Sequence, residues 1–264
     1  MNHAIQKLII SWCTILLLSV PVQTVADENK GLEIAKEADR RDTGYKDSTA
    51  RLVMELKNKQ GDTAIRHVRV KNLEVIGDGD KGMSIFDEPA DVKGTAFLTF
   101  SHSLTPDEQW LYLPSLKRIK RISSKNKSGP FMGSEFAYED ISSQEVDKYT
   151  YKYIKDEVLN GIDCFLIERY PAYEHSGYTR QLVWVNKNEY RPEKIVFYDR
   201  KDTLLKTLNY SHYKQYLGQY WRAEKMHMQN HQTGKSTLLS WFDYAFKTGL
   251  NDSDFSRNSL KRAK

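Results

Sequence analysis

The sequence predicts a mainly β protein of the α+β class, built on one curved antiparallel sheet or incomplete β-barrel of about 11 strands. Two observations favour this fold. Segments in which apolar and polar residues alternate recur from about residue 52 to residue 246, and turn residues separate them. Aromatic residues make up 12% of the chain, and broad rings suit strand positions. Because a sheet of this size curls by its own twist, we expect short helices to cover a concave, hydrophobic face.

The covering helices are predicted at two places. Residues 30–42 carry Leu32, Ile34, Ala35 and Ala38 at helical spacing, so a first helix is expected there. A second, short helix is predicted over residues 134–140, since Ser134 can cap it. The strands form one series before residue 114 and a long antiparallel meander after residue 146.

The N-terminal region resembles a secretory signal. Lys7 precedes an apolar run over residues 8–20, and small residues lead to Ala26. The run of about 13 residues is shorter than the roughly 20 that a membrane-spanning helix needs. We therefore expect residues 1–26 to be a signal peptide, cleaved after about Ala26, and residues 27–264 to form a single domain.

Composition limits the class of protein. Removal of the signal peptide takes away Lys7 and no acidic residue, so the formal charge falls from +5 to +4, with both signs mixed along the chain. This balance does not indicate a nucleic-acid binder. Cys164 is then the only cysteine left, so no disulfide can form within the chain. We expect its thiol to be buried as a small hydrophobic group.

Three apparent catalytic or metal motifs fail. The sequence GKST over 234–237 lacks the first glycine of a phosphate-binding loop, because Gln229 stands there. His227 and His231 lie in a segment that alternates like a strand, where positions four apart are about 13 Å distant. No G-x-S-x-G turn is present. We therefore name no catalytic, metal or cofactor residue and expect a protein that is not an enzyme.

A basic run occupies residues 117–127. One interpretation is an exposed sheet edge whose cations prevent aggregation. The other is contact with acidic lipid headgroups or with an acidic membrane partner, since a cation near an anionic surface contributes about 1 kcal/mol. For headgroup or partner contact, and for transient contact with a membrane surface, the candidates are Arg118, Lys120 and Arg121.

Large apolar residues at strand and cover positions are candidates for a cavity that accepts acyl chains. Methionine is adaptable, and large rings can line a groove without polar atoms. An ordinary packed core would use the same residue types, and periodicity does not separate the two interpretations. The candidates for the lipid cavity or its cover are Trp110, Phe136, Trp184, Met226, Met228 and Trp241.

The middle of the chain carries a resemblance to a known family. The segment LYLPSLKRIKRI over 111–122 is followed by GSEFAYEDI over 133–141, with Asp87-Glu88-Pro89 and Lys93-Gly94-Thr95 as supporting landmarks. This order resembles the LolA-like periplasmic outer-membrane lipoprotein-sorting proteins, in the branch associated with exporters. The resemblance implies the LolA/LolB-like fold, an unclosed curved sheet with helices over its hydrophobic side.

The same resemblance implies a function. It predicts a periplasmic carrier that binds lipid or lipoprotein acyl chains in a hydrophobic cavity and works with an RND-type inner-membrane exporter. Residues 125–133, with the segment around Phe136, are then the expected moving cover. Two alternatives remain open: an accessory interaction subunit of the exporter whose interior is a filled core, and a hydrolase that acts on lipids. No cofactor is implied.

Overall fold

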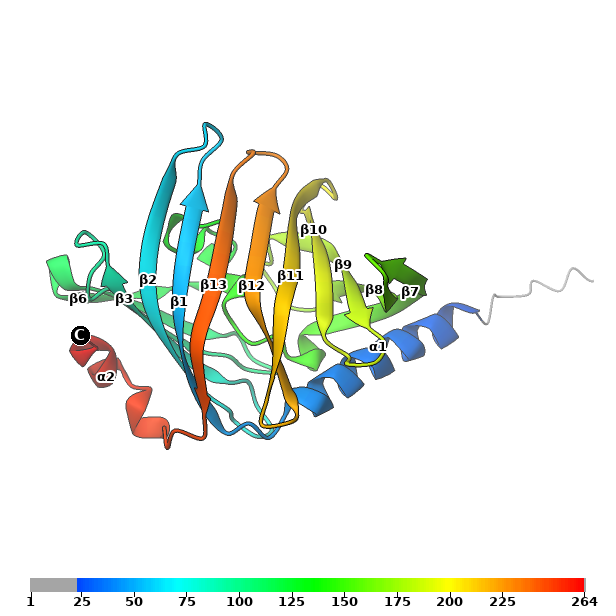
Figure 1. Ribbon diagram of the computed structural model, residues 1–264, viewed down its shortest axis with the longest axis horizontal. Helices are drawn as coiled ribbons and strands as arrows, with labels where there is room; N and C mark the ends of the chain where they lie inside the picture. Colours follow the sequence, from blue (N-terminus) through cyan, green and yellow to red (C-terminus); the bar gives the residue numbers. More distant parts are fainter. Residues whose placement is uncertain (1–22, 264) are drawn as a thin grey trace, which may run out of the picture.

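The fold is one large antiparallel sheet, seen in the computed structural model, which describes residues 23–263 (Figure 1). Within these residues the sheet has 13 strands, two more than predicted. The strands are β1 (Asp47–Lys57), β2 (Thr63–Leu73), β3 (Lys81–Glu88), β4 (Ala96–Phe100), β5 (Glu108–Leu113), β6 (Arg118–Ile122), β7 (Tyr149–Leu159), β8 (Ile162–Pro171), β9 (Tyr178–Asn186), β10 (Pro192–Asp199), β11 (Leu204–Tyr216), β12 (Tyr220–Asn230) and β13 (Ser236–Phe246).

Two meanders meet in the middle of this sheet. The order is β6-β5-β4-β3-β2-β1-β13-β12-β11-β10-β9-β8-β7, so the β1–β13 pair joins the first six strands to the last seven. The edge strands β6 and β7 do not pair with each other, and the sheet therefore stays open. The predicted unclosed, curved antiparallel sheet is confirmed. Alternation did not predict strand β6, but its exposed place at the edge agrees with the interpretation of the basic run as an exposed sheet edge.

The chain must cross the whole sheet between β6 and β7, because these strands lie at opposite edges. The crossing segment, residues 123–148, carries four 3-10 turns: η2 (Ser124–Asn126), η3 (Phe131–Gly133), η4 (Tyr138–Asp140) and η5 (Val146–Lys148). The helix predicted at 134–140 is wrong: Ser134 and Ala137 are extended, and the Phe131 amide bonds the Phe136 carbonyl. Phe131 and Phe136 are both 2% exposed, so the segment packs inward.

Two α-helices accompany the sheet. Helix α1 (Gln23–Asp42) begins seven residues before the predicted start and lies along one end of the strands (Figure 1). It approaches β7 closely at Gly31, where a Cβ atom would lie 2.8 Å from the Tyr153 amide nitrogen. Helix α2 (Arg257–Arg262) packs on β4 and β5. Among residues 23–263 no helix is both long and apolar enough to span a bilayer. The predicted signal peptide lies outside the described residues up to position 22.

Three apolar clusters hold the sheet. The largest lies on the concave face, where residues from most strands meet Ile34 of α1 and Phe131 and Phe136 of the crossing segment. A second cluster joins β3, β4 and β5 to Phe255 and Leu260 on the other face. A third surrounds Cys164, which is free and fully buried as predicted. The crossing segment and α1 therefore cover the concave side, and α2 covers part of the convex side.

Candidate functional site

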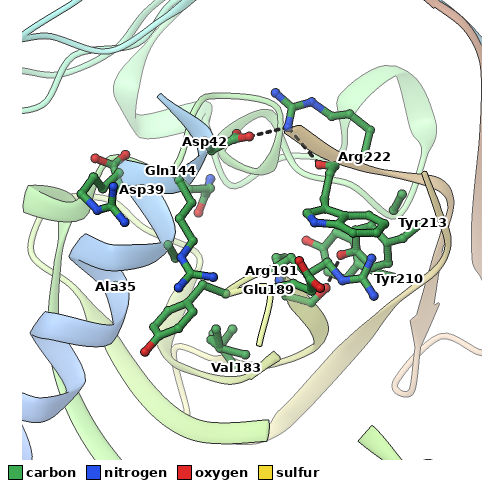
Figure 2. Close-up of a pocket in the computed structure, with 18 of the residues that line it drawn as sticks. Ala35, Asp39, Asp42, Gln144, Val183, Glu189, Arg191, Tyr210, Tyr213 and Arg222 are labelled. Atoms are coloured by element: carbon green, nitrogen blue, oxygen red, sulfur yellow. Dashed lines mark hydrogen bonds and ion pairs between the residues drawn. The ribbon is translucent and has the colours of Figure 1, made fainter. Parts of the chain in front are cut away.

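A cleft of about 930 Å³ opens between α1 and the concave face of the sheet (Figure 2). Its walls come from α1, from residues 143–146 of the crossing segment, and from strands β7 to β13 with the β9–β10 and β11–β12 turns. It is open to solvent rather than enclosed. The volume falls within the roughly 300–1,000 Å³ of sites that hold small organic ligands.

The floor of the cleft is apolar. Ile167 of β8, Val183 and Val185 of β9, Ile195 of β10 and Met226 of β12 face the same space. They share this face because side chains alternate along a strand, and neighbouring strands bring equivalent positions side by side.

The helix above the floor leaves room for a ligand. It presents Ala35 and Ala38, whose small side chains lie opposite the floor. A floor of this kind under a helix with small residues can accept an acyl chain.

Tyrosine and arginine side chains form the rest of the wall, and none of them was predicted from the sequence. The rings belong to Tyr45, Tyr151, Tyr190, Tyr210, Tyr213 and Tyr244, and the cations to Arg40, Arg41, Arg169, Arg191 and Arg222. Four carboxylates accompany them: Asp39, Asp42, Glu145 and Glu189. Burial raises the pKa of the carboxyl groups of Asp39 and Glu145. The cleft is therefore apolar at its floor and polar at its rim.

The end of α1 is bound to the rim of the cleft. Asp42 forms an ion pair with Arg222 of β12, drawn as a dashed line in Figure 2. Arg41 donates to the carbonyl of Asn188 at 2.5 Å, and Gln219 donates to the carbonyl of Arg41 at 3.3 Å. These bonds connect α1 to the β9–β10 and β11–β12 turns.

Arg191, in the β9–β10 turn, packs against two aromatic rings of the cleft wall. Its guanidinium carbon lies 3.9 Å from the ring centre of Tyr213 and 4.5 Å from that of Trp221. The Nε atom lies 3.3 Å from the Glu193 carboxylate. The Tyr213 hydroxyl donates to the Pro192 carbonyl, which fixes that ring. Stacking and packing therefore orient this guanidinium toward the cleft (Figure 2).

Comparison with known proteins identifies the family. A family model described as "Uncharacterized protein" matches residues 78–262. A crystal structure provisionally described as an outer-membrane lipoprotein-sorting protein domain from Vibrio parahaemolyticus is 60% identical, with a TM-score of 0.88, over 89% of this chain and 100% of that one. The chain belongs to the LolA-like lipoprotein-sorting family.

Further structures agree with this family. A DUF1329 family protein from Desulfovibrio piger is 30% identical, with a TM-score of 0.85, over 89% of this chain and 99% of that one. A LolA superfamily protein from Nitrosomonas europaea, 21% identical over 87% of this chain and 98% of that one, shares the fold with a TM-score of 0.70. No curated protein matches the sequence.

The six apolar candidates of this LolA-like chain lie in different places. Met226 and Trp241 line the cleft. Phe136 and Met228 lie on the concave side but inside the packed core, with 2% and 0% exposure. The structure therefore separates the candidates into cleft and core.

Two of the candidate tryptophans lie away from the cleft. Trp110 packs in the cluster beside α2, and Trp184 packs beside Cys164, where its indole N–H donates to Glu157 at 2.8 Å. Both alternate with concave-side residues, so their side chains point to the opposite face. These two tryptophans do not line the cleft.

The three basic candidates lie on the edge strand β6, and all are exposed. Lys120 pairs with Leu111 and Arg118 with Leu113, so both share the concave face with these leucines. Arg121 pairs with Trp110 and points to the convex face, where it lies 3.3 Å from a Glu108 oxygen. The candidates thus divide between two faces of the LolA-like sheet.

The crossing segment, predicted as the moving cover, has several anchors on the sheet. Asp140 forms an ion pair of 2.7 Å with Lys206, whose side chain is 5% exposed. Asn230 donates to the Glu135 carboxylate at 2.6 Å, and Arg66 donates to the carbonyl of Met132. These contacts hold the crossing segment against one end of the concave face. The cleft lies beyond it, under α1.

Proposed function

We propose that this LolA-like domain is a periplasmic carrier that binds the acyl chains of a lipid or lipoprotein in the cleft under α1. The observation that supports this most is the cleft itself, an apolar floor with an open side on the concave face of an unclosed sheet. The lipoprotein-sorting description of the Vibrio parahaemolyticus relative supports the same class of cargo. The carrier does not act as an enzyme in this proposal.

The energetics of acyl binding fit such a cleft. Each CH₂ group that leaves water contributes about 0.8 kcal/mol, so a floor lined by Val183, Ile195 and Met226 can hold a chain without a specific polar contact. The bonds between the end of α1 and the two turns are few and lie at the rim. We propose that α1, rather than the crossing segment, moves when cargo enters or leaves.

The test is the lipid content of the purified protein. Residues 27–264, prepared from the periplasm without detergent, should yield stoichiometric lipid or acylated peptide in an organic extract measured by mass spectrometry. The variant Ala38→Trp fills the cleft from α1 and should lose most of this lipid at an unchanged melting temperature. Ala90→Trp, at an exposed position, is the matched control and should keep it. An extract without lipid from the unmodified protein, and no uptake of added lipid, would contradict the proposal.

A partnership with an RND-type exporter is a finer proposal, supported by the resemblance alone. The exposed edge strand β6 offers Arg118 and Lys120 on one face for contact with an acidic partner or a membrane surface. The double variant Arg118→Ala and Lys120→Ala should then weaken capture of the exporter from the same membranes. Arg121→Ala, on the other face, is the control and should leave the capture unchanged. Equal capture by all three proteins would contradict this role.

The two alternative functions predict different results. An accessory interaction subunit would bind the exporter strongly and carry no lipid in either the purified protein or the uptake experiment. A hydrolase would convert phospholipid to products, and a single carboxylate or histidine substitution would abolish turnover. The carrier proposal predicts that added phospholipid is recovered intact.

A further inference from the structure

An arginine with free donor atoms lines the cleft. The Nε and Nη1 atoms of Arg191 are buried and, within the described part of the chain, have no hydrogen-bond acceptor. The Glu193 carboxylate lies 3.3 Å from Nε, which gives charge attraction without a hydrogen bond. Buried donors are satisfied in most native sites, so these N–H groups are suited to an acceptor that a ligand supplies.

A second unpaired donor lies in the same cleft. The indole Nε1 of Trp241 is buried and likewise lacks an acceptor among residues 23–263. Four buried side-chain atoms of the described residues lack a partner, and three of them belong to these two cleft residues. Both groups can only donate, so the complementary ligand atom is an acceptor, such as an oxygen of a phosphate or carboxylate.

Most other arginines of the cleft wall are paired with carboxylates. Arg222 is paired with Asp42, while Arg40 and Arg41 are paired with Glu37. Arg191 has a single carboxylate at ion-pair distance, and that carboxylate also accepts from the Asn186 amide at 3.0 Å. A guanidinium that lies against two rings presents a planar fork of donors that suits an oxyanion.

Arg169 is the other cation with a weak electrostatic partner. It donates to the side-chain oxygens of Gln181 at 2.7 Å and Gln144 at 3.1 Å, which are neutral. Arg169 pairs with Gln181 in β9, whereas Pro192, next to Arg191, pairs with Val185. The two pairing positions lie four residues, about 13 Å, apart along β9, so the two arginines lie toward opposite ends of the apolar floor.

We propose that the cleft binds an amphiphile with an anionic oxygen headgroup, a phosphate or a carboxylate, and that Arg191 binds this headgroup. The acyl chain then lies on the floor formed by Val183, Ile195 and Met226, and the headgroup stays at the rim between Tyr213 and Trp221. This inference rests on the proposed carrier function and adds the chemical class of the ligand.

The test compares headgroups on one chain length. Dodecyl phosphate, dodecanoate, dodecyl maltoside and dodecyltrimethylammonium are titrated below their micelle concentrations by calorimetry, together with inorganic phosphate alone. The two anionic amphiphiles should bind about tenfold or more tightly than the neutral and cationic ones, the effect of a charged hydrogen bond. Arg191→Gln should remove this preference and leave maltoside binding unchanged. Arg51→Gln, an exposed arginine outside the cleft that is paired with Asp243, is the matched control and should keep the preference.

Each other outcome has a defined meaning. Equal binding of all four amphiphiles overturns the inference but leaves the carrier proposal standing, whereas no binding of any amphiphile overturns both. Loss of the preference in Arg169→Gln instead of Arg191→Gln overturns the assignment to Arg191. If inorganic phosphate binds as tightly as dodecyl phosphate, the inference that the ligand is an amphiphile is overturned, and the cleft is a site for a free anion. If Arg191→Gln does not fold, Arg191→Lys and the ranking of headgroups on the unmodified protein decide the question.

Discussion

The two ends of the concave face differ in how they are covered, and strand β12 shows the difference. Met228 lies under the crossing segment and is fully buried, whereas Met226, two residues earlier on the same face, lines the cleft under α1. At the first end the cover brings its own phenylalanines and a buried ion pair. At the second end, α1 adds Ile34 to the core, but over the cleft it presents alanines and a few bonds to the β9–β10 and β11–β12 turns. The comparison indicates that one cover completes the core and the other leaves space for a ligand.

The largest expected effect is a loss of stability at the end of the concave face that the crossing segment covers. Lys206→Ala removes the partner of Asp140, whose side chain is only 9% exposed, and leaves an uncompensated carboxylate in the interior. The free energy of unfolding should fall by about 3–5 kcal/mol, measured by urea denaturation. Lys36→Ala removes an exposed ion pair on α1 and should cost less than about 1 kcal/mol. A loss below 1 kcal/mol in Lys206→Ala would show that this end is not held as described.

The two methionines of β12 give the most direct comparison within one strand. Met228→Ala should destabilise the protein by about 2–5 kcal/mol, because a cavity remains in a packed core. Met226→Ala should cost clearly less, because its side chain already borders open space. Both values come from the same denaturation experiment. Equal losses would mean that the cleft is closed over Met226 in solution.

A smaller effect is the pH dependence of stability that comes from Asp80, beside the cleft. Burial raises the pKa of Asp80 to about 6, and this carboxylate accepts from the hydroxyl of Tyr45, a cleft residue. The folded protein therefore holds a proton that the unfolded chain releases near pH 4, and the stability from this group falls as the pH rises from about 4 to 6.

The variant Asp80→Asn isolates that contribution. Its amide oxygen can still accept the bond that the Val75 amide donates, and its NH₂ group can donate to the Tyr45 hydroxyl, which faces the other carboxylate oxygen. The unfolding free energy of the unmodified protein minus that of the variant should fall by roughly 2 kcal/mol between pH 4 and pH 6 and stay level above pH 7. A difference that is constant or rises over this range would contradict the raised pKa.

The sequence predicted the kind of fold because strand alternation is local. The same alternation does not say which face is concave, so Trp110 and Trp184 could not be separated from Met226 and Trp241 before the sheet was seen. The helix predicted at 134–140 failed because tertiary contacts of Phe131 and Phe136 determine that segment.

The polar residues of the cleft wall could not be predicted from the sequence for a related reason. Arg191 lies in a turn, and its role depends on Tyr213 and Trp221, which are 22 and 30 residues away in the chain. No local pattern connects these three residues. Only the pairing of β10, β11 and β12 brings them together.

The most direct test of the central claim is methyl NMR of the protein with ¹³C-labelled methionine methyl groups, titrated with dodecanoate. We expect the Met226 signal to shift and saturate with added ligand, while the Met228 signal keeps its position because Met228 lies in the filled core. Met226→Leu and Met228→Leu assign the two signals. A Met226 signal that does not move, or a Met228 signal that moves as much, would contradict the assignment of the cleft under α1 as the acyl-chain site.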